Sequence, residues 1–128
     1  MAVRIEEYVL KGREFIGQVA TALQKPDDID HANQVTVSVL HALRNLLTPE
    51  ESLHLIAQLP LYIKAAYVDG WHYDEEKKSK SRRTIPPQEV EAVFSVLEKY
   101  VGVGEMQHVV AQLPAEMKLD AEFQKPKN

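Results

Sequence analysis

The chain repeats itself at a fixed offset, and this repeat constrains its fold more than any other feature. Gln58-Leu59-Pro60 returns 54 residues later as Gln112-Leu113-Pro114. At the same offset, identical residues recur at six further pairs of positions: Val39 and Val93, Leu43 and Leu97, Glu51 and Glu105, His54 and His108, Ala57 and Ala111, Lys64 and Lys118. A repeat of this length is typical of one supersecondary unit used twice, in which each unit buries the apolar face of the other. The sequence therefore predicts two pseudo-symmetric halves, at about residues 34–68 and 88–122.

Apolar residues recur at helical spacing through both halves. Between residues 29 and 47 they form a continuous stripe with a period of 3.6 residues, and an equivalent stripe runs between residues 87 and 101. These stripes predict two long helices. A further helix is expected over residues 5–24, where Gly12 and Gly17 each weaken it by about 1 kcal/mol relative to alanine, so it should depend on docking. The predicted fold is an all-α, compact helical bundle of two repeats plus an N-terminal helix.

Shorter helices should follow each long one. Thr48 is suited to cap a helix, Pro49 to its first position and Glu51 to the returning carboxylate of a capping box. Pro60 interrupts that helix, and residues 61–68 are expected to resume it. In the second half, a short helix should end near Leu113, and a last helix should contain Met117 and Leu119.

Residues 72–84 separate the halves and have no apolar period. Acids at residues 74–76 precede a basic run at residues 77–83. We interpret this segment as a mobile, solvated linker, although the basic run could contact phosphates. Nucleic-acid binding through it is a third and weaker functional alternative.

Composition excludes several classes of protein. The chain has 128 residues, enough for one domain spanning residues 1–128, and a net charge of −4, which disfavours nucleic acid and anionic membranes as partners. It has no cysteine, so disulfides, thiolate metal sites and cysteine nucleophiles are impossible. The acidic N-terminus is unlike a signal peptide and no apolar stretch is long enough to span a membrane, so we expect a soluble, cytoplasmic protein.

The repeated motif resembles a known family. The segments Ala57-Gln-Leu-Pro60, Tyr67-Val-Asp-Gly-Trp71 and Ala111-Gln-Leu-Pro114 are similar to the pattern of the bacterial domain of unknown function 2267. The resemblance covers residues 15–123. It implies an all-helical fold of bacterial origin and no particular activity. The helix that the pattern places ahead of Pro86 is replaced here by charged residues.

Two Glu-x-x-His motifs are the sharpest chemical candidates. Glu51 and His54, and their equivalents Glu105 and His108, each share a helix face. Two such motifs are half of the di-metal pattern of helical bundles, which also needs one acid from each of two other helices. The long helices supply no symmetric pair of acids. We therefore favour a structural interpretation, in which both histidines form contacts between the halves, and expect no metal and no cofactor.

Glutamine and aromatic residues give further candidates. Gln58 and Gln112 precede prolines, and each side-chain amide could bond to a carbonyl that the proline leaves without a helical donor. Binding of a peptide or ligand by these amides is the less favoured alternative. Tyr67, Trp71 and Tyr73 cluster beside the linker, where aromatic residues could equally bind a partner or close the end of the core.

The sequence contains no nucleophile elbow, phosphate loop or other local catalytic motif. The predicted function is a non-enzymatic protein-interaction or structural module that binds a protein partner or a second copy of itself. The alternative is a metal- or small-ligand-binding protein with its site between the halves.

Overall fold

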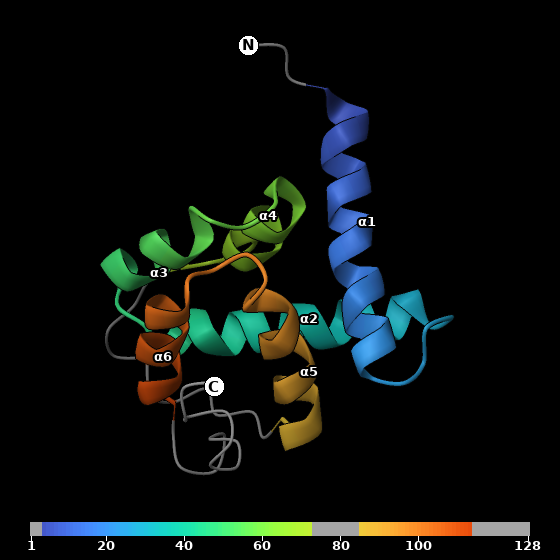
Figure 1. The fold of residues 1–128 in the computed structure, drawn as a ribbon. Coiled ribbons are helices and arrows are strands. Elements are labelled where there is room, and N and C mark those ends of the chain that lie inside the picture. The colour runs from blue at the N-terminus through green and yellow to red at the C-terminus, as the bar shows by residue number, and fades with distance from the viewer. Residues whose placement is uncertain (1–3, 73–84, 114–128) are drawn as a thin grey trace.

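The computed structural model describes residues 4–72 and 85–113, and these residues form six helices and no strand (Figure 1). The helices are α1 (Ile5–Ala22), α2 (Ile29–Leu46), α3 (Pro49–Ile56), α4 (Leu61–Val68), α5 (Pro87–Leu97) and α6 (Val103–Ala111). The predicted all-α fold is confirmed. Two predicted segments lie outside the described residues: the linker from residue 73 onward and the helix after Pro114. The pseudo-symmetry of the two halves stays a prediction.

Helix α2 is the centre of the bundle. It packs against α1, α3, α4 and α5, and its apolar stripe is buried among them. The helix begins after Asp28, whose side chain accepts a hydrogen bond from the His31 amide at 3.1 Å. Leu43 of α2 and its repeat equivalent Leu97 of α5 are both fully buried. The stripe that predicted α2 is therefore the stripe that forms the core.

Helix α5 is shorter than its predicted range of 87–101. After Leu97, the chain continues through a tightened turn, in which the Lys99 amide bonds to Val96 O and the Tyr100 amide to Leu97 O. Bonds between residues three apart are common where a helix ends, because they use carbonyls that no longer have a partner four residues on. Val101 nevertheless remains buried, as its place in the repeat predicts.

Two side chains of α2 fasten the end of α4. One guanidinium nitrogen of Arg44 donates to Tyr67 O at 2.9 Å and to Asp69 O at 2.7 Å. His41 Nε2 donates to Ala66 O at 2.8 Å. The last carbonyls of a helix have no partner within the helix and carry partial negative charge, so cationic and N–H donors stabilise them. These bonds fix α4 against α2, and α4 forms one wall of the candidate site described below.

Helix α1 stands against the rest of the bundle and extends beyond it (Figure 1). It contacts α2 and α4 of the first half and α5 of the second. Its buried residues begin only at Gly12, so the first two turns project from the body. The Phe15 ring lies 5.4 Å from the Tyr100 ring between centroids, which adds a contact to the second half. The helix without a repeat counterpart thus packs against both halves.

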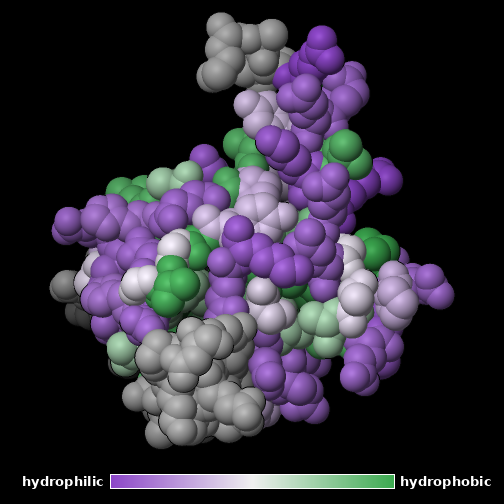
Figure 2. Space-filling model, in the orientation of Figure 1, coloured by the Kyte–Doolittle hydropathy of each residue, from purple (hydrophilic) through white to green (hydrophobic). Residues whose placement is uncertain are grey.

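The surface in Figure 2 is largely hydrophilic, and its hydrophobic residues form separate patches. Among the described residues, no helix is both long enough and apolar enough to cross a lipid bilayer.

Candidate functional site

The two Glu-x-x-His motifs meet through only two of their four side chains. His108 Nε2, at the end of α6, lies 2.8 Å from Glu51 Oε2, at the start of α3. The side chain of His54 is exposed, and Glu105 is not part of this contact. In the described part of the chain, no group of three or more His, Cys, Asp or Glu side chains gathers as metal ligands would. Glu51 and His108 join α3 to α6, which agrees with the structural interpretation for His108, whereas the exposed side chain of His54 does not form the contact that was expected of both histidines.

Glu51 also completes the predicted capping box. Its other carboxylate oxygen accepts from the Thr48 amide at 2.8 Å, while the Thr48 hydroxyl accepts from the Glu51 amide at 3.1 Å. The Thr48 backbone bond and then the His108 bond hold the pKa of Glu51 below its ordinary value of 4.5, because both favour the ionised carboxylate. One carboxylate therefore both starts α3 and joins it to α6.

Replacing Glu51 with alanine should lower the free energy of unfolding by about 1 kcal/mol at neutral pH, the usual net contribution of a hydrogen bond, because the carboxylate no longer accepts from the Thr48 amide and His108. Because folding lowers the pKa of Glu51, its contribution is complete above the pKa of the unfolded chain and is lost as the pH falls through the folded pKa. Urea unfolding of wild type and variant between pH 3 and 7 measures this. The gap between them should narrow as the pH falls below the ordinary pKa of glutamate.

Glu50→Ala is the matched control, since Glu50 is an exposed acid in the same helical turn. A gap that stays constant with pH, or an equal loss from Glu50→Ala, would contradict the role assigned to Glu51.

Gln58 makes the local bond expected beside Pro60 and a second bond to the other half. Its side-chain nitrogen donates to His54 O at 3.1 Å. Its side-chain oxygen accepts from the Gly102 amide at 3.4 Å, immediately before α6. The start of α3 is thus joined to the end of α6, and the end of α3 to the start of α6. The side chains of Gln58, Glu51 and His108 therefore hold α3 and α6 together.

Of the two alternatives left open for the aromatic candidates, Tyr67 fits closure of the core. Tyr67 is 0% exposed, and its hydroxyl pairs with Ser52 Oγ at 2.6 Å inside the core. Burial raises the pKa of Tyr67 to about 12, against smaller lowering effects of Ser52 and Arg44. Trp71 is half-buried and packs edge-on against the Tyr67 ring at 5.8 Å between centroids. Tyr73 lies outside the described residues.

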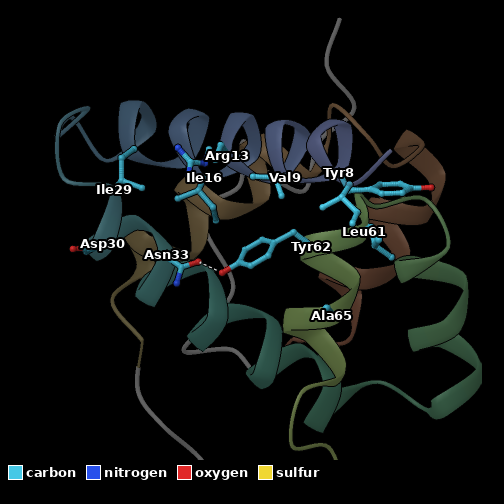
Figure 3. A pocket seen from close by; sticks show the side chains of 12 residues that line it. Tyr8, Val9, Arg13, Ile16, Ile29, Asp30, Asn33, Leu61, Tyr62 and Ala65 are labelled. Atoms are coloured by element: carbon cyan, nitrogen blue, oxygen red, sulfur yellow. Dashed lines mark hydrogen bonds between the residues drawn. The ribbon is translucent and has the colours of Figure 1, made fainter. Parts of the chain in front are cut away.

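The structure instead places a candidate surface elsewhere, in a groove between α1 and α4 that the start of α2 closes (Figure 3). We call it the α1–α4 groove. It encloses about 590 Å³, and its walls include Ile5, Val9, Ile16, Ile29, Leu61 and Tyr62. Many of these side chains remain uncovered: Ile5 is 73% exposed, Val9 and Leu61 are 47% exposed, and Tyr62 is 42% exposed. Apolar side chains that gather in a concavity usually mark a binding surface.

Tyr62 spans the groove and is held in place. Its hydroxyl donates to Asn33 Oδ1 at 2.8 Å, so α4 is tied to α2 across the floor (Figure 3). At Gly12, α1 approaches α4 so closely that an added Cβ would lie 2.7 Å from Tyr62 Cβ. Gly12 therefore has a packing role in addition to its effect on helix propensity. The groove has a fixed wall on each side.

The groove was missed in the sequence because its residues do not form a motif. Ile5 and Val9 lie four residues apart on α1, so they share one helix face beside the buried stripe of Phe15 and Val19. Apolar residues such as Ile5 and Val9, which lie beside the buried stripe and are not needed for the core, are the sequence feature that could have indicated the groove. The groove also lies against the first half and not between the halves, where a ligand site was predicted.

Comparison with protein families finds a match over most of the chain. The model described as "Uncharacterized conserved protein (DUF2267)" matches residues 12–119. A comparison with curated proteins finds no match.

Proposed function

The chain belongs to the DUF2267 family, and we propose that it is a non-enzymatic protein-interaction module that binds its partner in the α1–α4 groove. The observation that carries this proposal is the gathering of exposed large apolar side chains along one groove of about 590 Å³. Proteins use such grooves to bind the apolar face of a partner helix, because burying that face releases water from both surfaces.

The residues that line the groove are better suited to binding a partner than to catalysing a reaction. Its surface is mostly apolar, and the Tyr62 hydroxyl is already bonded to Asn33. Of the charged residues, Arg13 and Asp30 line it, and both are exposed. A surface of this kind recognises an apolar face with charges at its margin. It has the anatomy of a protein interface, with an apolar centre and a polar rim.

A photoreactive residue placed at Val9 tests the proposal in cells that make this protein. We expect discrete crosslinked adducts from this position, identified by mass spectrometry. The same residue at Lys11 is the control, since Lys11 is exposed on a different face of α1. The adducts should disappear in a Leu61→Asp variant, because a buried carboxylate on the opposite wall is costly to desolvate.

Leu61 is 47% exposed at the first position of α4, so this variant should fold, and its thermal midpoint checks that it does. Equal, diffuse labelling from Val9 and Lys11, or adducts that survive Leu61→Asp in the folded protein, would contradict the groove as the binding surface.

A further inference from the structure

The first two turns of α1 carry apolar side chains that are largely exposed. Ile5, Val9 and Leu10 are 73%, 47% and 56% exposed, and no residue of α1 before Gly12 is buried. A helical segment this short has little stability of its own in water. Ile5 and Val9 also line the α1–α4 groove. These turns of α1 extend beyond the body of the protein (Figure 1). The projecting turns and the groove therefore form one continuous uncovered surface.

Two exposed charged residues beside this surface, Glu6 and Arg13, could form ion pairs between two molecules of the chain. Glu6 and Arg13 are seven residues apart, close to two full turns, so they lie on the same flank of α1. Both are exposed, and Arg13 is at the margin of the groove. If two α1 helices lay parallel about a two-fold axis, these flanks would face opposite sides, and the charges of the two molecules would not meet. If they lay antiparallel about a point between Val9 and Leu10, Glu6 of each would meet Arg13 of the other.

We infer that the occupant of the groove is α1 of a second molecule of this chain, in an antiparallel, two-fold symmetric pair centred between Val9 and Leu10. This inference rests on the proposed function and names its partner. Charged pairs that flank an apolar seam set the orientation of paired helices, and here they select the antiparallel one.

The apolar residues fit this arrangement. With the axis at this level, the Val9 side chains of the two molecules, which line the groove, lie next to each other. Ile5 of the second molecule then comes level with residue 14 of the first, at the end of the groove where Ile16 and Ile29 lie (Figure 3). Because the contact is isologous, each molecule covers the exposed turns of the other. No free surface of the same kind is left to continue the assembly.

Charge exchange tests the orientation in solution. Light scattering should give wild type a mass of twice the 14.5 kDa of the chain at micromolar concentration. Glu6→Arg and Arg13→Glu should each weaken the dimer about tenfold or more, since each breaks two symmetric pairs and creates two repulsions. The double variant, with both charges exchanged, should return the dissociation constant to within about threefold of wild type. Glu7→Arg, which makes the same change on a different face, is the matched control.

The absence of native cysteine allows a second, geometric test. Val9→Cys places one thiol per molecule next to the proposed axis, so mild oxidation should yield a covalent dimer. Glu7→Cys should not yield one, because its thiols would point away from the contact, beyond disulfide reach. Both variants change exposed residues, so folding should be preserved.

A wild type that remains monomeric at all concentrations, a dimer that Val9→Cys fails to link, or a double charge exchange that fails to restore affinity would overturn the inference. If α1 does not self-associate but a photoreactive Val9 captures a different protein, the proposed function stands and this partner is wrong. If photoreactive Val9 captures neither a second copy of this chain nor a different protein, both the proposed function and this inference are wrong.

Discussion

Replacing Leu43 with alanine is expected to lower the free energy of unfolding by about 2–5 kcal/mol, and Leu97→Ala should do the same. Both side chains are 0% exposed, one in α2 and the other at its repeat equivalent in α5, and these two helices pack against each other. The loss combines the transfer of buried methyl groups with the cavity that remains between packed helices. Equilibrium unfolding in urea, followed by circular dichroism, measures both variants.

Leu53→Ala is the control for these core variants, because Leu53 is a leucine in α3 that is 59% exposed. It should change the free energy of unfolding by less than about 1 kcal/mol. If Leu43→Ala or Leu97→Ala proved as mild as Leu53→Ala, that position would not belong to the shared core.

Gly12→Ala should destabilise the protein by about 1–3 kcal/mol, although alanine favours helix by about 1 kcal/mol over glycine. The added Cβ would lie 2.7 Å from Tyr62 Cβ, which is attached directly to the α4 backbone and cannot rotate away. Relief therefore requires α1 and α4 to separate. The expected readout is a lower thermal midpoint.

Gly17→Ala is the matched comparison within the same helix. An added Cβ at Gly17 meets nothing within 4 Å, so only the gain in helix propensity remains. We expect it to stabilise the protein by about 0.5–1 kcal/mol. The opposite signs of the two substitutions are the test. Stabilisation by both would show that α1 and α4 are not in close contact at Gly12.

Local signals in the sequence predicted the helices well, because those signals act within a few residues. Thr48, Pro49 and Glu51 specify the start of α3 through their own bonds, and the structure confirms the capping box. Pro60 separates α3 from α4, as its missing amide requires. The stripe over residues 29–47 became α2 with its apolar face inward. Each of these outcomes depends on nearest neighbours along the chain.

The candidate site depends on contacts that no local pattern encodes. Nothing near Gly12 in the sequence states that Tyr62 will pack on it, 50 residues later. Tyr67 and Tyr62 lie on one short helix, and only the packing of that helix decides which is buried. For Tyr67, the sequence left a partner surface and closure of the core as equal alternatives. In the structure, Tyr67 is buried and its hydroxyl is hydrogen-bonded to Ser52. The orientation of α4 against α1 and α2 made this difference.

The position of α1 has a consequence for how the chain folds as it is synthesised. This helix leaves the ribosome before its neighbour α5, which begins 65 residues after α1 ends. The ring contact between Phe15 of α1 and Tyr100 likewise cannot form until Tyr100 has been synthesised. Contacts so distant along the chain form late and slow folding, because the intervening loop must first be closed. The nascent first half therefore holds α1 with part of its apolar face exposed, and the bundle is completed only when the second half arrives.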